Sequence, residues 1–277
     1  MGKDLIFDMI DNSTKKIIFF DIDGTLIDDT TKQMQESTKE AIRIARENGH
    51  ICMINTGRTQ RLVNPDTIGQ ITFDGYLMGG GTMVVYHDKV LYHKTLSKEL
   101  TGRIMDALKK YKIDALLEGR EENFSDVPEN MYTDSFKRFA AGYAGRHYDT
   151  FDHALGRFDK IFAYTDDPAA MKAFRDEFAE ELDFIHREND FYEIGPKGYS
   201  KATAIHYITE QLGIPMENTV AIGDSNNDLP MLQCAHTSIA MGNSAKKVLE
   251  IADYITTDVN ADGIWNALQW LGVLGKL

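Results

Sequence analysis

Cysteine, basic charge and long hydrophobic runs are all scarce in this sequence. Its 277 residues include two cysteines, Cys52 and Cys234, which are too few for a disulfide framework and lack the spacing of a metal site. No apolar run approaches the roughly 18 residues that a membrane-spanning helix needs. The densest run, residues 17–22, suits a buried strand instead. We therefore expect a protein without a membrane partner.

The shortage of basic residues gives a formal net charge of −13 at pH 7. Binding to nucleic acid requires clustered lysine and arginine, so nucleic acid is not an expected partner. Residues 1–14 have neither the basic start nor the continuous apolar stretch of a secretion signal. Because free thiols also suit a reducing compartment, the sequence predicts a cytoplasmic protein.

Short apolar segments alternate with helical patterns along the first part of the chain. The segment KKIIFFDID at residues 15–23 has the composition of a buried strand, and residues 36–48 have helical spacing that ends at Gly49. Further strands are expected at residues 50–56 and 76–78. This alternation predicts an α/β fold, with a Rossmann-like parallel sheet and helices on both of its faces.

The pattern changes after Thr82, where residues 83–87 and 90–93 resemble an antiparallel hairpin. An α+β segment follows, with helices expected at residues 98–111 and 168–181 and strands at residues 114–118, 160–165, 184–186 and 191–194. Strands again alternate with helices after Pro196. We therefore predict a core formed by residues 1–82 and 196–277, with residues 83–195 inserted as an α+β cap domain.

Acidic residues follow two of the expected core strands, at the sheet edge where open α/β folds bind ligands. Asp21 and Asp23 stand in the string DIDGT, and Asp224 and Asp228 stand in GDSNND. A turn or a helix N-cap would also use such residues, but the D-x-D-G-T string arises by chance only about once in 100,000 positions. Carboxylates that converge there would repel one another without a cation, which favours bound Mg²⁺.

Two further segments carry hydrogen-bond donors. Thr56, Gly57 and Arg58 follow another strand and could bind a phosphoryl oxygen, while Lys201 begins a helix. Taken singly, the threonine segment is a weak signal and Lys201 would be an ordinary surface lysine. Only their occurrence together with the acidic segments makes them candidates.

These four segments, in this order, resemble the four motifs of the haloacid dehalogenase superfamily, and most of all its Cof-type phosphatases with a type II cap of the B subtype. The motifs are DxDGTL from Asp21, the TGR segment, KGYSK ending at Lys201, and GDxxND with a following methionine. The resemblance covers most of the chain. One departure is GGGT at residues 79–82, where relatives often have Asn-Gly-Ala, and a substrate contact from that asparagine is not expected here.

The resemblance implies a Mg²⁺-dependent phosphatase of small phosphorylated metabolites, such as sugar phosphates or phosphorylated cofactors. Asp21 would form an aspartyl phosphate, and Asp23 would act as acid and base. Asp21, the main-chain carbonyl of Asp23 and Asp224 would bind Mg²⁺. The other implied site residues are Thr56 and Lys201 at the phosphoryl group, Asn227 and Asp228 in or behind the metal site, and Gly57 and Arg58 as structural or substrate contacts.

Two alternatives remain open: a phosphomutase of the same fold, and a non-catalytic protein that binds a phosphorylated ligand. Specificity is expected to reside in the cap, where Glu118, Arg120 and His186 are candidates that could equally be surface or packing residues. Aromatic residues at 136–148 could line a pocket, although such spacing is more typical of a core. The sequence leaves the oligomeric state open.

Overall fold

The computed structural model describes residues 15–63, 68–143, 148–187 and 190–275. In this part of the chain an eight-stranded sheet forms the core, in the order β14-β13-β12-β1-β2-β3-β4-β5. Neighbouring strands from β14 to β3 are parallel, and β4 and β5 complete one edge in antiparallel pairing. The strands are β1 (Ile17–Phe20), β2 (Ile51–Asn55), β3 (Gly75–Met78), β4 (Met83–Tyr86), β5 (Lys89–His93), β12 (Thr219–Gly223), β13 (Thr237–Ala240) and β14 (Tyr254–Ile255).

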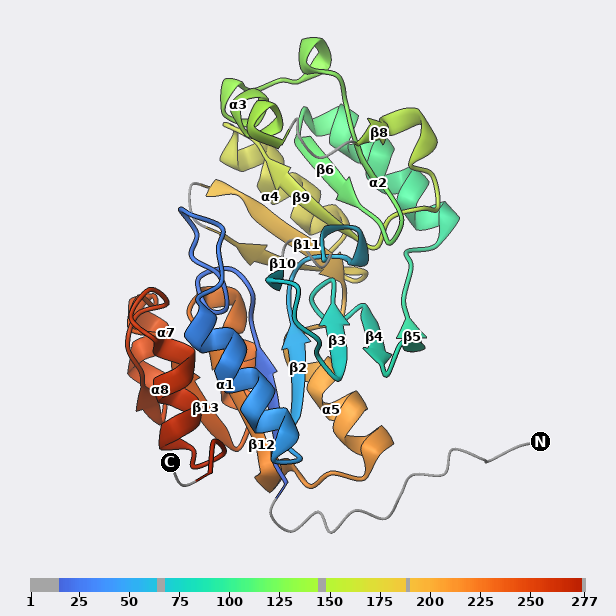
Figure 1. Ribbon diagram of the computed structural model, residues 1–277. Coiled ribbons are helices and arrows are strands. Elements are labelled where there is room, and N and C mark those ends of the chain that lie inside the picture. Colours follow the sequence, from blue (N-terminus) through green and yellow to red (C-terminus); the bar gives the residue numbers. More distant parts are fainter. Residues whose placement is uncertain (1–14, 64–67, 144–147, 188–189, 276–277) are drawn as a thin grey trace, which may run out of the picture.

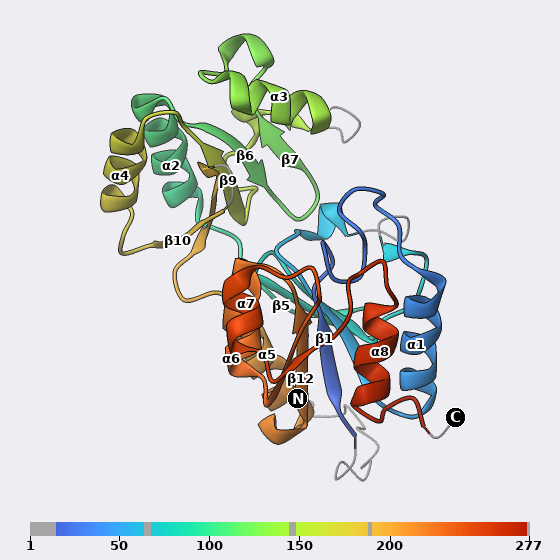
Figure 2. The same ribbon diagram turned by 90° about the vertical axis from the view of Figure 1, so that its left-hand side faces the viewer.

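Helices cover both faces of this sheet because its central strands are apolar on both sides. In β1, Ile18 and Phe20 pack toward one face and Ile17 and Phe19 toward the other, and all four side chains are fully buried. Figure 2 shows the two helical layers on either side of the sheet. One layer holds α1 (Glu36–Glu47) and α8 (Gly263–Trp270), and the other holds α5 (Lys201–Leu212), α6 (Leu229–Cys234) and α7 (Lys246–Ile251). The predicted fold class is confirmed.

The hairpin of β4 and β5 belongs to the core sheet, although its sequence pattern led us to predict it as part of the cap. Met78 pairs with Met83 across a turn in which Gly79, Gly80 and Gly81 all have positive φ angles. The side chains of Met83 and Val84, which follow this turn, are buried hydrophobic residues of the core. The predicted boundary at residue 83 therefore falls inside the core sheet, and a cap that begins after β5 fits the pairing better.

The cap is built on a second sheet, with the strand order β10-β11-β9-β6-β7-β8 among the described residues. Figure 1 shows it above the carboxyl ends of the parallel core strands. Helices α2 and α4 pack on one face, and α3 packs on the other. The elements are α2 (Lys98–Tyr111), β6 (Asp114–Glu118), β7 (Asn123–Ser125), α3 (Asp134–Tyr143), β8 (Asp149–Thr150), β9 (Lys160–Tyr164), α4 (Pro168–Glu177), β10 (Leu182–His186) and β11 (Tyr192–Pro196).

Most cap elements appear where the sequence predicted them, but α3 and the short strands β7 and β8 were not anticipated. In helix α3, Phe136 and Ala140 are the buried residues that attach the helix to the sheet. Residues 1–14, which were analysed for a secretion signal, lie outside the described residues. No helix in the described part of the chain has the length and apolar character needed to span a membrane.

Candidate active site

The candidate site lies where the order of the core strands reverses. From β1 the chain proceeds to β2 and β3 on one side, and it later returns through β12 on the other side of β1. Asp21 directly follows β1, and its main-chain N–H donates to the carbonyl of Ile222 in β12 at 3.0 Å. Asp224 directly follows β12. Open α/β sheets bind ligands at such a switch point, because the diverging loops leave a crevice between the two strand ends.

Three buried carboxyl groups meet in this crevice: those of Asp21, Asp224 and Asp228. One oxygen from each lies within 4.8 Å of the others. Burial, together with the neighbouring carboxylates, raises the pKa of Asp21 to about 7 and that of Asp224 to about 8. The arrangement therefore favours a bound cation, which would remove the repulsion and keep both groups ionised.

Lys201 supplies one positive charge to this cluster. Its Nζ donates to Asp21 Oδ1 at 2.6 Å and to Asp228 Oδ1 at 2.5 Å, with only 3% of its side chain exposed. Burial alone would lower the pKa of Lys201, but the two carboxylates raise it, so the amine stays charged. Lys201 is thus a buried ion-pair partner, not the surface lysine that it would be in isolation.

Local structure fixes the position of Lys201. It is the first residue of α5, where the Ser200 side chain accepts a hydrogen bond from Thr203 N–H and the Thr203 hydroxyl accepts one from Ser200 N–H. The buried Asn55, at the end of β2, donates to the main-chain carbonyl of Lys201 at 3.0 Å. Helix capping and a tertiary hydrogen bond therefore hold the lysine beside the strand ends.

Asp228 organises the loop that carries Asp224. Its Oδ2 accepts the main-chain N–H groups of Asp224 at 3.0 Å and Ser225 at 2.9 Å, and its Oδ1 accepts Lys201. The side chain is completely buried. Because both oxygens already have partners, Asp228 fits the predicted place behind the metal site better than that of a direct ligand. Asn227 accepts from the Ser225 hydroxyl at 2.5 Å and lines the adjoining cleft.

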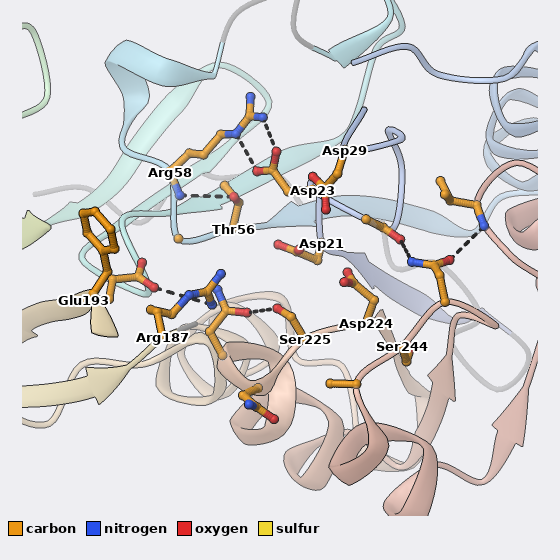
Figure 3. Close-up of a pocket in the computed structure, with 18 of the residues that line it drawn as sticks. Asp21, Asp23, Asp29, Thr56, Arg58, Arg187, Glu193, Asp224, Ser225 and Ser244 are labelled. Carbon is orange, nitrogen blue, oxygen red and sulfur yellow. Dashed lines mark hydrogen bonds and ion pairs between the residues drawn. The ribbon is translucent and has the colours of Figure 1, made fainter. Parts of the chain in front are cut away.

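Asp23 pairs with Arg58, an interaction that was not predicted from the sequence. Nε of Arg58 donates to Oδ2 at 2.8 Å and Nη2 donates to Oδ1 at 2.5 Å (Figure 3). Burial alone would raise the pKa of Asp23, but these hydrogen bonds and the guanidinium charge lower it. The carboxyl group is therefore ionised in this arrangement.

The turn that follows Asp23 packs directly against Asp224. Gly24 has a φ angle of 77°, and a side chain there would collide with the carboxylate of Asp224. The next residue, Thr25, donates its hydroxyl to Asp224 Oδ1 at 2.7 Å. This explains why glycine and threonine follow the two aspartates in the DIDGT string.

Thr56 and Gly57 form the wall of the cleft beside β2. The Thr56 hydroxyl accepts the main-chain N–H of Arg58 at 3.1 Å, and Gly80 N–H donates to the Thr56 carbonyl at 3.0 Å. The glycine-rich turn that departs from the family pattern therefore supports this wall through its main chain. Gly57 faces the cap, and Lys160 Nζ donates to its carbonyl at 2.8 Å.

Core and cap together enclose a cleft of about 840 Å³, which is within the range of small-molecule sites. The predicted residues Asp21, Asp23, Thr56, Gly57, Arg58, Asp224 and Asn227 line it, while Lys201 and Asp228 lie buried behind them. Of the cap candidates, Glu118 lines the cleft. Arg120 instead donates to Gln60 of the core at 2.9 Å, and His186 is exposed beside Asp190.

Several cap residues in the cleft were not predicted from the sequence. They are Lys160, Phe162, Arg187, Phe191 and Glu193, and Phe139 was considered only within a group of aromatic residues better suited to a core. Within that group the fully buried Phe136 is a core residue, and residues 144–147 lie outside the described residues. A usable signal was present in β9, where Lys160 and Phe162 alternate with Ile161 and Ala163 and so share one face of a strand.

Comparison with known proteins agrees with this geometry. Residues 18–268 match the family model of haloacid dehalogenase-like hydrolases. YkrA of Bacillus subtilis (strain 168), whose phosphatase name is provisional, is 29% identical over 261 residues, which is 94% of this chain and 98% of YkrA. YcsE of the same organism, named as a 5-amino-6-(5-phospho-D-ribitylamino)uracil phosphatase, is 26% identical over 257 residues, which is 92% of this chain and 94% of YcsE.

Solved structures show the same fold. A hypothetical protein from Geobacillus kaustophilus HTA426 superposes with a TM-score of 0.81 at 27% identity, over 94% of this chain and 99% of that one. The subclass IIB sugar phosphatase BT4131 superposes with a TM-score of 0.79 at 24% identity, over 94% and 100% of the two chains. These matches confirm the predicted family and the predicted class of enzyme, a hydrolase of phosphoric monoesters. The chain belongs to the haloacid dehalogenase-like hydrolase family.

Proposed function

We propose that this hydrolase is a Mg²⁺-dependent phosphatase that acts on small phosphorylated metabolites through an aspartyl phosphate on Asp21. The observation that carries the proposal is the contact of Asp21 with the buried ammonium group of Lys201, at the floor of a cleft that also holds Asp224. The phosphatase names of the relatives support the substrate class, which includes sugar phosphates and phosphorylated cofactors. Such substrates are consistent with the predicted cytoplasmic location.

In the proposed reaction, a carboxylate oxygen of Asp21 attacks phosphorus and the bond from phosphorus to the leaving oxygen breaks. Lys201 stabilises negative charge beside the nucleophile, and Thr56 lies at the cleft wall where a phosphoryl oxygen can accept a hydrogen bond. Water then attacks phosphorus, phosphate leaves, and the Asp21 carboxylate is restored.

Asp23 is the proposed proton carrier in both steps. It would protonate the leaving oxygen and later accept a proton from the attacking water. The contacts to Arg58 favour its ionised form, so proton donation requires the guanidinium group to release at least one of the two oxygens. The position of Arg58 therefore bears on the first step more than on the second.

The donor set fits a divalent cation such as Mg²⁺, which prefers carboxylate and carbonyl oxygens. One carboxylate oxygen of Asp21 accepts a hydrogen bond from Lys201, and one of Asp224 accepts a hydrogen bond from Thr25. The other oxygen of each residue has no hydrogen bond among the described residues. These two free oxygens, with the Asp23 carbonyl, would hold the ion. When bound, it would neutralise charge on the phosphoryl group.

Replacement of the nucleophile tests the proposal directly. Asp21→Asn should abolish Mg²⁺-dependent phosphate release from p-nitrophenyl phosphate, because an amide cannot form the acyl phosphate. Asp176→Asn, an exposed change on α4, is the matched control and should leave turnover unchanged. The proposal would be wrong if Asp21→Asn hydrolysed the ester at the rate of the unaltered protein.

A panel of phosphate esters, assayed with Mg²⁺ and with EDTA, tests the metal and the substrate class together. Hydrolysis should require Mg²⁺ and should release free phosphate. Conversion of a sugar 1-phosphate into its 6-phosphate without phosphate release would instead identify a phosphomutase. Ligand binding without turnover across the panel would identify a non-catalytic phospho-ligand-binding protein.

A further inference from the structure

The cap sheet presents one of its faces to the cleft, and that face is divided into a polar and an aromatic zone. Side chains alternate along β9, so Ile161 and Ala163 are fully buried against the layer of α2 and α4. Lys160 and Phe162 point to the opposite face and line the cleft. Lys160 lies in the polar zone beside the core, and Phe162 begins the aromatic zone.

In the polar zone, the hydrogen-bond donors of Lys160 are all used by contacts within the protein. Lys160 Nζ lies 3.2 Å from Glu118 Oε2, forms an ion pair with Glu193, and donates to the carbonyl of Gly57. Only 5% of the Lys160 side chain is exposed. Because all three of its donor directions have acceptors, Lys160 positions the cap above the core and is not available to bind a substrate.

The aromatic zone consists of Phe139 from α3, Phe162 from β9 and Phe191, which precedes β11. The rings of Phe162 and Phe191 are stacked, with centroids 4.8 Å apart and planes 15° apart. The Phe139 ring lies 5.2 Å from Phe162 and 5.5 Å from Phe191. All three side chains are only partly buried and line the cleft, so they offer apolar ring surface to whatever binds there.

Arg187 lines the same part of the cleft, after β10. Its Nη1 is buried and lies 3.8 Å from Glu193 Oε2, which is too far for a hydrogen bond, and it has no other partner among the described residues. Buried donors without partners are uncommon because they lose their hydration without compensation. Figure 3 shows Arg187 next to Glu193 at the cap side of the site. The guanidinium charge is therefore only partly compensated within the described residues, and the 30% of the Arg187 side chain that is exposed lines the cleft, where a ligand with an acceptor could pair with it.

We propose that the alcohol part of the substrate carries a planar aromatic or heteroaromatic ring that packs on Phe139, Phe162 and Phe191, with an acceptor at its edge for Arg187. This inference rests on the proposed phosphatase function and narrows it. A cleft of about 840 Å³ has room for a ring beyond the phosphoryl group. A simple sugar phosphate could accept a hydrogen bond from Arg187 through its hydroxyl oxygens, but it has no planar π-face to match the phenylalanine rings.

Benzyl phosphate and cyclohexylmethyl phosphate test the preference for a planar ring. Both are esters of primary alcohols and have similar size, but only benzyl phosphate has a flat π-system. We expect kcat/KM to be roughly threefold to tenfold higher for benzyl phosphate, mainly through a lower KM. Equal values for the two esters would overturn the inference while leaving the phosphatase function standing. Absence of phosphate release from every ester, p-nitrophenyl phosphate included, would overturn both.

Single substitutions test whether the preference for benzyl phosphate arises from the aromatic zone. Phe191→Leu should bring the ratio of the two kcat/KM values close to one, and Phe191→Tyr should retain it because the ring remains. Phe184→Leu is the matched control, since Phe184 is an aromatic residue of β10 that packs against α4 on the other side of the cap sheet. Retention of the full ratio in a folded Phe191→Leu protein, as judged by circular dichroism, would contradict the assignment.

A second pair of esters tests Arg187. We expect 4-carboxybenzyl phosphate to exceed benzyl phosphate in kcat/KM by roughly tenfold, through a charge-assisted hydrogen bond. Arg187→Gln should remove this advantage and bring the ratio of the two kcat/KM values close to one. A carboxylate advantage that survives in Arg187→Gln would overturn the arginine contact.

Discussion

Among single residues, Lys201 has the largest influence on the charge of the site. Asp21, Asp224 and Asp228 place three carboxyl groups in a buried crevice, and Lys201 is bonded to two of them. Its positive charge favours the ionised form of Asp21, against the burial that raises the pKa of that carboxyl group. Asp21, the proposed nucleophile, and the ammonium group of Lys201 therefore form a coupled pair, and the charge of each depends on the other.

Replacement of Lys201 should lower kcat far more than replacement of a neighbouring lysine. We expect Lys201→Gln to lower kcat by about 100-fold or more, because the charge beside the reacting group is lost. Lys197→Gln, in the same segment but about half exposed, is the control and should retain activity. Melting curves would establish that both variants fold, and a Lys201→Gln protein with more than half of the normal kcat would contradict the assigned role.

At the scale of elements, the cap strands β6, β9 and β11 bring two acids to one lysine. Burial alone would raise the pKa of Glu193, but Lys160 and Arg187 lower it to about 2. Glu118, on the other side of Lys160, has a raised pKa, chiefly because of burial. The ammonium group of Lys160 therefore stabilises the ionised form of Glu193 more than that of Glu118.

This difference predicts how the stability of the cap depends on pH. The pKa of Glu193 is about 2 when folded and near 4.5 otherwise, so its stabilising contribution is complete above about pH 4.5 and declines as the pH falls toward 2. Glu193→Gln should lower the free energy of unfolding by a few kcal/mol at pH 7 and by clearly less near pH 3. Urea unfolding at several pH values measures this.

Two features of that experiment need control. Glu180→Gln changes a highly exposed acid on the same domain and should have little effect at any pH. Glu118, Lys160 and Arg187 also face Glu193, and because the charge of Glu193 raises the pKa of Glu118, its loss should favour the ionised form of Glu118 and reduce the difference at pH 7. A stability difference that stays constant from pH 7 to pH 3 would show that Glu193 acts by packing and not by charge.

On the scale of the whole molecule, polar contacts near the proposed catalytic residues join the cap to the core. Lys160 donates to the carbonyl of Gly57, and Arg120 donates to Gln60. Gly57 belongs to the same wall as Thr56, so a change in the position of the cap would also change the shape of the proposed phosphoryl site. Figures 1 and 2 show the cap over the strand ends in both views.

A methyl group at Gly57 should disturb this contact selectively. The added Cβ would lie 2.5 Å from Glu193 Oε1, so this carboxylate, which is ion-paired with Lys160 at the contact between cap and core, would have to move. We expect Gly57→Ala to reduce kcat/KM by roughly tenfold or more while the melting temperature changes little. Gly195→Ala, where a Cβ meets no atom within 4 Å, is the control. Normal kcat/KM in Gly57→Ala would show that cap placement does not limit the reaction.

Local patterns made the core of this protein predictable. Asp21, Thr56 and Asp224 follow strands with clear apolar runs, and parallel strands bring such ends to one edge of a sheet. In the cap, helix α2 has the predicted bounds because its apolar periodicity and its N-cap at Ser97 are both local signals. The roles of the site residues remain predictions, but their proximity follows from the fold.

The rest of the cap was less predictable because its signals are not local. Nothing in the order of residues indicates that Phe139 on α3 meets Phe162 and Phe191, or that Arg58 pairs with Asp23 across 35 positions. The local pattern after Thr82 correctly predicted a hairpin, but only the pairing of β4 with β3 shows that this hairpin belongs to the core sheet. Strand partners are chosen by long-range packing, which a local pattern does not encode.

The sequence by itself determined the α/β class, the family and the set of residues at the core strand ends, because strand and turn preferences act over a few neighbouring residues. The tertiary structure alone decided that Lys160 of the cap contacts Gly57 of the core and that Arg187 lines the cleft with three phenylalanines. Those relations depend on how two sheets face each other. The chemistry could thus be inferred from the motifs, whereas the ring-binding surface could be inferred only from the packed cap.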